Sequence, residues 1–192
     1  MMPGRVRVTL VGIAIAAGSI AIGRAQAQRA SWLDTPKPAP WNSAGMPIPP
    51  APQVRGNLDP HCRELARPPQ SDEDQRLRDQ GWDLVGAFQG GWQILVIRGT
   101  AGYDGMCRPL QFQDFVFVRG NFAGTLSPRP VDSRTDGALG RVTLESDRRL
   151  VAEYARYSVA DPLCCPSRTT SVVFDVANDS ILRAVSAVTA RR

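Results

Sequence analysis

The fold is decided by the stretch Trp82-Asp83-Leu84-Val85-Gly86-Ala87-Phe88-Gln89-Gly90-Gly91-Trp92-Gln93-Ile94-Leu95-Val96. Apolar or small residues occupy every second position on both sides of the glycine pair, which is the spacing that gives a strand one apolar face. A glycine pair suits a tight turn with positive φ. The stretch therefore predicts an antiparallel β-hairpin with its turn at Gly90-Gly91.

Three more hairpins are predicted downstream from the same two signals, alternating apolar residues and a short polar turn. They pair 111–118 with 122–126, 140–145 with 148–157, and 169–176 with 180–188. No stretch after Gly81 has a helical period. The expected fold class is α+β: mainly an antiparallel β-sheet or open barrel of about eight strands, with one or two short N-terminal helices.

Two short helices are expected before the strands. Asp59-Pro60 is typical of a helix start, with proline at the first helical position, and Pro68-Pro69 ends that turn. Ser71 then precedes three acidic residues, the pattern of a capped second helix. Gly81 suits a left-handed helix end, after which Trp82 can contact Leu77.

The N-terminal residues 1–27 predict an export signal. Arg5 and Arg7 precede an uncharged apolar run, and Ala25-Gln26-Ala27 offers a small-x-small cleavage site. The run, 8–22, is about 15 residues, shorter than the roughly 20 that span a bilayer, so an uncleaved anchor is the weaker alternative. No cysteine lies near the cleavage site to carry a lipid, and no later stretch is apolar enough to span. The mature protein is expected in the periplasm or secreted.

Residues 28–57 carry seven prolines and are expected to form a flexible, extended spacer, because proline removes backbone donors and fixes φ. Residues 58–192 remain as a single domain, expected to be stapled by disulfides. Removing residues 1–27 takes away three arginines and no acid, so the net charge falls from +5 to +2. Such a balance gives no electrostatic case for a nucleic-acid partner.

Four cysteines allow three disulfide pairings. A bond within the adjacent pair Cys164-Cys165 closes a strained eight-membered ring, and neighbouring side chains of an extended backbone point to opposite sides. We therefore expect Cys62 and Cys107 each to bond one cysteine of the pair, in either combination. A zinc site is a weaker alternative because no C-x-x-C spacing exists. A cysteine nucleophile activated by His61 is another weaker alternative, because cysteines paired in an oxidising compartment cannot serve.

Two long connections, 98–109 and 127–139, are candidate binding loops, because binding residues concentrate on loops carried by a rigid sheet. Their candidate residues are Tyr103, Asp104, Arg108, Arg134 and Asp136. The Asp-Gly pairs in both loops are also ordinary turn formers. No spacing singles out a catalytic pair, and nothing in the sequence indicates a metal or a cofactor.

Several motifs together resemble the LppP/LprE family of exported bacterial lipoproteins, over roughly residues 75–185. They are Gly102-Tyr103-Asp104-Gly105-Met106-Cys107-Arg108-Pro109, Val116-Phe117-Val118, Phe122-Ala123-Gly124-Thr125-Leu126-Ser127-Pro128, Asp136-Gly137 and Asp161-Pro162-Leu163-Cys164-Cys165-Pro166-Ser167. The resemblance implies a single cell-envelope domain of uncharacterised biochemical function. It supplies no catalytic residues, and this chain lacks the lipobox cysteine that would carry a lipid.

The expected function is that of an exported, non-catalytic envelope module that binds a protein or envelope component through the loops 98–109 and 127–139. A periplasmic hydrolase that uses the carboxylates of Asp104 and Asp136 is the alternative. A redox-active thiol protein is a third hypothesis, and it predicts free thiols. The sequence specifies neither the partner nor the oligomeric state.

Overall fold

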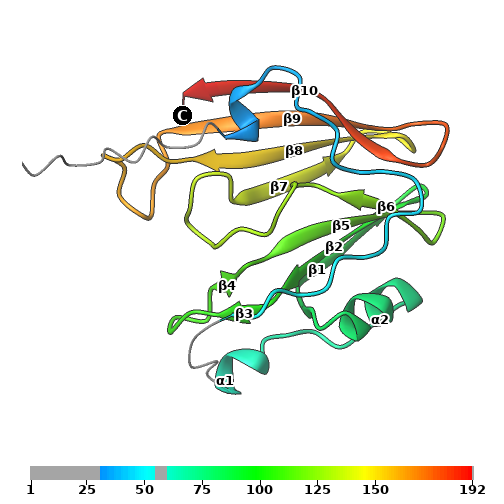
Figure 1. Cartoon of the computed structure of the whole chain (residues 1–192). Helices are drawn as coiled ribbons and strands as arrows, with labels where there is room; N and C mark the ends of the chain where they lie inside the picture. The colour runs from blue at the N-terminus through cyan, green and yellow to red at the C-terminus, as the bar shows by residue number, and fades with distance from the viewer. Residues whose placement is uncertain (1–30, 55–59, 192) are drawn as a thin grey trace, which may run out of the picture.

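Two four-stranded antiparallel sheets form the body of the protein in the computed structural model, which describes residues 31–54 and 60–191 (Figure 1). The first sheet has the order β1-β2-β5-β6, from β1 (Asp83–Gly91), β2 (Ile94–Thr100), β5 (Gln113–Val118) and β6 (Asn121–Thr125). The second has the order β10-β9-β8-β7, from β7 (Leu139–Leu144), β8 (Arg149–Arg156), β9 (Arg168–Val176) and β10 (Leu182–Arg191). A small third sheet pairs β3 (Gly102–Tyr103) with β4 (Pro109–Leu110).

The predicted fold class is confirmed, because the eight strands of the two large sheets are those of the four predicted hairpins. The first turn is displaced from the prediction. Gly91 pairs with Ile94, so the turn residues are Trp92 and Gln93, and Trp92 itself takes the positive φ of 52°. The glycine pair instead ends β1. The second turn lies where the sequence predicts it, with positive φ at Arg119 and Gly120.

The two sheets pack face to face and enclose the larger core. Side chains on β8 and β9 alternate between buried and partly buried, so one face of the second sheet is turned inward. Leu150, Tyr154 and Phe174 are fully buried there against Val96 and Val116 of the first sheet. Figure 1 shows the two layers one above the other.

The opposite face of the first sheet is also covered. Phe115 and Phe117 point away from the second sheet and pack with Leu77 and Trp82 in a separate buried cluster. Leu77 belongs to α2 (Asp72–Asp79), whose N-cap is Ser71 as predicted. The backbone N–H of Trp82 donates to the carbonyl of Leu77 at 3.2 Å, which completes the predicted helix end at Gly81. A shorter helix, α1 (Pro60–Arg63), precedes it, as predicted.

Residues 31–54, named here the N-terminal strap, are packed onto the sheets, and the prediction of a flexible spacer is wrong for them. The strap begins with a 3-10 helix, η1 (Trp32–Asp34), and then runs as coil from the second sheet to the first (Figure 1). Leu33 is buried in the inter-sheet core, and the carbonyl of Pro49 accepts a hydrogen bond from the Trp82 indole at 2.8 Å. Prolines exclude regular structure, but they do not prevent a segment from burying its other side chains.

Asn42 of the strap joins the two sheets where their edge strands meet. Its side-chain amide donates to the carbonyl of Thr125 on β6 at 3.1 Å and to that of Leu182 on β10 at 3.0 Å. Its carbonyl accepts from the N–H of Thr125 at 2.9 Å. Backbone groups at exposed sheet edges otherwise need water or another strand.

The predicted export signal, residues 1–27, lies outside the described residues. Within residues 31–54 and 60–191, no helix has the length and apolar character needed to cross a membrane.

Candidate functional site

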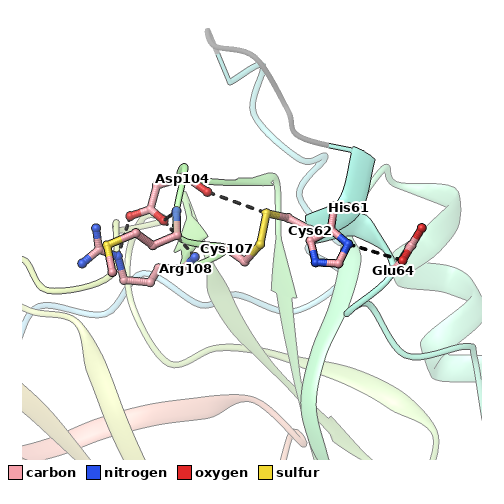
Figure 2. The surroundings of a disulfide bond; sticks show 7 residues. His61, Cys62, Glu64, Asp104, Cys107 and Arg108 are labelled. Atoms are coloured by element: carbon pink, nitrogen blue, oxygen red, sulfur yellow. Dashed lines mark hydrogen bonds and ion pairs between the residues drawn. A yellow bond between two sulfur atoms is a disulfide. The ribbon is translucent and has the colours of Figure 1, made fainter.

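The first predicted binding loop is organised around the carboxylate of Asp104 (Figure 2). Asp104 Oδ1 accepts hydrogen bonds from the backbone N–H groups of Met106 and Arg108, both at 2.9 Å, and Oδ2 accepts from Arg108 Nε at 2.5 Å. Burial raises the pKa of Asp104, but the N–H groups and the guanidinium outweigh it and hold the pKa below its usual value. The carboxylate therefore shapes the turn between β3 and β4.

Tyr103 is a core residue and not part of an exposed binding loop. It is 3% exposed and packs in a small cluster with Cys62 and Val85. Its hydroxyl has no hydrogen-bond partner among the described residues. Burial, followed by the nearby charge of Asp83, raises the pKa of Tyr103 to about 12.

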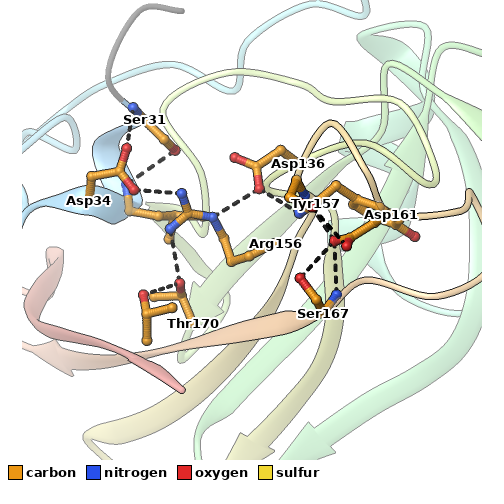
Figure 3. A network of polar contacts seen from close by, with 11 residues as sticks. Ser31, Asp34, Asp136, Arg156, Tyr157, Asp161, Ser167 and Thr170 are labelled. Carbon is orange, nitrogen blue, oxygen red and sulfur yellow. Dashed lines mark hydrogen bonds and ion pairs between the residues drawn. The ribbon is translucent and has the colours of Figure 1, made fainter. Parts of the chain in front are cut away.

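The two candidate residues of the second predicted loop differ, because one projects into solvent and the other is bonded within the protein. Arg134 is exposed and has a positive φ of 61°. Asp136 Oδ1 accepts from Arg156 Nε at 2.9 Å and from the N–H of Tyr157 at 2.8 Å (Figure 3). The Arg156 side chain is 4% exposed and also donates to Thr170 at 3.1 Å, so Asp136 neutralises an otherwise buried cation.

The two loops lie side by side and are joined by hydrogen bonds of residues other than the candidate ones. The N–H and hydroxyl of Ser133 donate to the carbonyl of Pro109 at 3.1 and 2.8 Å. The backbone and side-chain amides of Gln111 donate to Asp132 Oδ1 at 2.8 and 2.9 Å. These bonds make the loops one rigid surface, named here the loop surface, from which Met106 and Arg134 project into solvent.

The predicted disulfide pairing is wrong. Cys62 bonds Cys107, with a Cα–Cα distance of 5.0 Å (Figure 2). Cys164 bonds its neighbour Cys165. The prediction assumed an extended backbone at the adjacent pair. Instead, the N–H of Cys165 donates to the carbonyl of Pro162 at 2.9 Å, so the pair lies in a turn. A turn does not send neighbouring side chains to opposite sides as a strand does.

These bonds leave no reduced cysteine among the described residues. His61 is exposed, and its Nδ1 lies 3.5 Å from the carboxylate of Glu64 (Figure 2). A Cys–His nucleophile therefore has no thiol here. The described residues also contain no cluster of three or more histidine, cysteine or acidic side chains suited to a metal ion.

One ion pair, between the partly buried Arg98 and the buried Asp114, lies between the sheets, where the first loop begins and the second loop ends. Arg98 Nε donates to Asp114 Oδ1 at 2.9 Å, and Arg98 Nη2 donates to the carbonyl of Leu139 at 3.0 Å. Burial raises the pKa of Asp114, opposed by the charge of Arg98. The pair borders a cavity of about 80 Å³, and its bond to Leu139 ties the first sheet to the second.

The sequence analysis missed an open groove of about 700 Å³ at the opposite end of the sheets, named here the turn-end groove. Its lining residues come from the β7–β8 turn, the β9–β10 turn and the adjoining strand ends: Glu145, Ser146, Arg148, Arg149, Asp175, Val176, Ala177, Asn178, Arg183 and Val185. A neighbouring hollow shares Glu145 and Ser146 and includes Trp92, which is 65% exposed. In the sequence, this groove is marked only by the charged residues of the two turns, and charged residues are common in turns.

Arginines dominate the turn-end groove, but each has an acceptor within the protein. Arg149 binds Asp175 through two bonds of 2.7 and 2.9 Å, and the Arg149 hydrogen bond lowers the pKa of Asp175. Arg148 donates to the side chain of Asn178 at 2.8 Å, and Arg183 donates to Asp179 at 2.6 Å. A guanidinium has five N–H donors, so donors remain that can face a ligand.

The fold and these surfaces define a disulfide-bonded antiparallel β-domain that presents rigid loops at one end and a groove at the other. The model of the LppP/LprE lipoprotein family matches residues 92–179 of the chain, which confirms the resemblance that the motifs indicate. The matched segment runs from the first turn of the first sheet to the last turn of the second. No curated protein and no solved structure matches the chain.

Proposed function

We propose that this protein is an exported, non-catalytic module of the cell envelope that binds a protein or another envelope component. The match to a family described as lipoproteins supports a place in the envelope. The two disulfides support an oxidising compartment, because cytosolic thiols are normally kept reduced. The predicted signal supports export to the periplasm or the medium as part of this proposal.

The observation that carries the non-catalytic assignment is the bonding of the two loop carboxylates. Asp104 holds its own turn together, and Asp136 holds the buried guanidinium of Arg156. A general base works best with a pKa near the operating pH, whereas the pKa of Asp104 is lowered. These contacts argue against the hydrolase alternative.

The loop surface is the first binding surface that we propose. The bonds between Ser133 and Pro109 and between Gln111 and Asp132 fix the two loops before any partner arrives, which reduces the entropy lost on binding. Met106 is 69% exposed and supplies an adaptable apolar contact, and Arg134 supplies a charge.

The turn-end groove is a second candidate surface, favoured by its composition. Tryptophan and arginine are the residues most enriched among side chains that dominate binding energy, and Trp92 and Arg148 both line this end. The φ of 52° at Trp92, unusual for a residue other than glycine, holds this side chain at the tip of its hairpin.

Affinity capture from envelope extract tests the function and separates the two surfaces. The bait is the chain from Gln28 onward, compared with a loop variant, Met106→Asp with Arg134→Glu, and a groove variant, Trp92→Ala with Arg148→Glu. We expect a partner that one variant loses and the other retains. Asp79→Asn, on the exposed side of α2, is the control. Equal capture by all four baits would contradict both surfaces, and turnover in a hydrolase screen would contradict the non-catalytic assignment.

A further inference from the structure

The two disulfides of this protein lie in opposite surroundings. Cys62 is fully buried, and its bond to Cys107 joins α1 to the turn between β3 and β4 across 45 positions of sequence. Cys164 and Cys165 are both exposed, on the loop between β8 and β9, and their bond spans a single position. Cys107 is only partly buried, but the second bond, exposed at both cysteines, is the more open to an approaching thiolate.

The bond between Cys164 and Cys165 cannot stabilise the fold in the way that disulfides usually do. A disulfide stabilises mainly by restricting the unfolded chain, by an amount that grows with the loop that it closes. A bond between neighbours closes no loop of the chain beyond its own ring. Its presence on the surface therefore points to chemistry of the bond and not to the stability of the domain.

The loop that carries this bond is held together near the strands, at the end named here its base, by hydrogen bonds that do not involve the sulfur atoms (Figure 3). The carboxylate of Asp161 accepts four hydrogen bonds, from the N–H and hydroxyl groups of Ser158 at 2.8 Å each and from those of Ser167 at 2.9 and 2.8 Å. The two N–H groups, with the hydroxyls, hold the pKa of Asp161 well below its usual value. The carboxylate thus closes the loop at its base.

This base confines any opening of the disulfide to the tip of the loop. Pro166 is buried beside the base, and the hydroxyl of Tyr157 donates to the carbonyl of Leu163 at 3.1 Å. Residues 162–165 can consequently change conformation when the sulfur bond breaks, while β8 and β9 stay paired. Leu163, 65% exposed next to the cysteines, offers an apolar contact for a molecule that reaches them.

We propose that Cys164–Cys165 is a thiol–disulfide exchange site that accepts two electrons from a dithiol. A thiolate of the dithiol attacks one sulfur, forming a mixed disulfide and releasing the other cysteine as a thiolate, which takes up a proton. The second thiol of the dithiol, as a thiolate, then attacks the dithiol's own sulfur in the mixed disulfide and releases the second cysteine as a thiolate, which also takes up a proton. The dithiol leaves as a disulfide, and Cys164 and Cys165 remain as two thiols; the reverse reaction restores the bond. This site is independent of the proposed binding function.

Graded reduction of the oxidised protein tests the proposal, with Cys62–Cys107 as an internal control. Samples are equilibrated with increasing dithiothreitol, alkylated with N-ethylmaleimide and mapped by mass spectrometry of peptides. We expect Cys164 and Cys165 to be alkylated at a dithiol concentration at least about tenfold lower than Cys62 and Cys107. Reduction of both bonds at the same concentration would overturn the proposal. So would a map of the unreduced protein that links Cys62 or Cys107 to the adjacent pair.

Two further measurements separate exchange at the loop tip from partial unfolding. Circular dichroism melting of the protein reduced at the adjacent pair should match that of the oxidised protein and of Cys164→Ala with Cys165→Ala. A lowered melting temperature on reduction would overturn the confinement of the change to the tip. Oxidised dithiothreitol, added in excess after removal of the reductant, should restore the bond. Failure to re-form it in folded protein would overturn reversible exchange.

Discussion

Arg156 and Asp34 form an ion pair across 122 positions of sequence, with Arg156 Nη2 2.5 Å from Asp34 Oδ1 (Figure 3). Asp34 belongs to the N-terminal strap and Arg156 to the end of β8. The same guanidinium binds Asp136 of the second loop. One buried cation therefore fastens the strap and the loop surface to the same strand.

Replacing Asp34 by asparagine should loosen the strap. Arg156 keeps the carboxylate of Asp136 but loses one charged partner, and we expect the free energy of unfolding to fall by about 1 kcal/mol. The estimate is kept small because the Asp34 side chain is 47% exposed and water screens the pair. Urea unfolding of both proteins at pH 7 measures the change. Asp79→Asn, an exposed carboxylate bonded to Gln75 of its own helix, should have less effect.

The effect of Asp34→Asn should depend on pH. The hydrogen bond from Arg156 lowers the pKa of Asp34 below the usual 3.8. Because the folded state holds the proton less tightly, the stabilisation is present above pH 3.8 and is lost as pH falls through the lower pKa. The difference between the two proteins should thus shrink at the acid end of a pH series. A constant difference between pH 6 and the acid limit would contradict the ion pair.

The contact of Asn42 with Gly124 predicts coupled effects of substitution. A Cβ added at Gly124, whose φ is 137°, would lie 2.3 Å from Asn42 Cγ, so Gly124→Ala should be strongly destabilising. Asn42→Ala removes three buried hydrogen bonds and should cost about 2–3 kcal/mol. In the Asn42→Ala background, Gly124→Ala should cost less, because the clashing side chain is gone. A double-mutant cycle by urea unfolding measures this coupling, and strictly additive costs would contradict it.

Tyr103→Phe should leave stability near neutral pH unchanged or raise it slightly. The substitution removes a buried hydroxyl that has no partner among the described residues. Above pH 10 the two proteins should diverge. The unfolded tyrosine ionises near 10.0 and the folded one at about 12, so the native protein loses stability as pH rises through that window. Tyr103→Phe should lack this loss, and identical alkaline unfolding curves would contradict the buried position of the hydroxyl.

The two disulfides should contribute very differently to stability. Cys62→Ala with Cys107→Ala opens a closure of 45 positions and should lower the free energy of unfolding by about 4 kcal/mol in the chain-entropy model. Cys164→Ala with Cys165→Ala should change it by less than about 0.5 kcal/mol, since no chain loop is released. Chemical unfolding of both double variants measures the contrast. Equal losses would contradict this division between the two bonds.

The hairpins and the capped helix were predictable because their signals are local. Alternation within one strand, a capping Ser71 and a glycine at the helix end each act over a few residues. The first turn was misplaced because Trp92 takes a backbone conformation that normally favours glycine.

The docking of the strap and the pairing of the cysteines were not predictable, since both depend on contacts that form only in the folded protein. Proline content predicts the lack of helix and strand in the strap, but not that Asn42 meets two edge strands. The adjacent cysteines lie in a turn, and their sequence alone is equally compatible with a strand. The candidate charges Asp104 and Asp136 look exposed in sequence because their partners, backbone amides and a buried arginine, carry no motif.

The strap also fixes the order in which the molecule can be completed. Its Asn42 contacts Leu182, 140 positions later, and its Pro36 accepts from the N–H of Ala187 on the last strand. A chain made N-terminus first therefore cannot complete the docking of the strap before β10 exists. A chain stalled before β10 keeps the strap's contacts with Thr125 and Trp82 but lacks those that Asn42 and Pro36 make with the last strand.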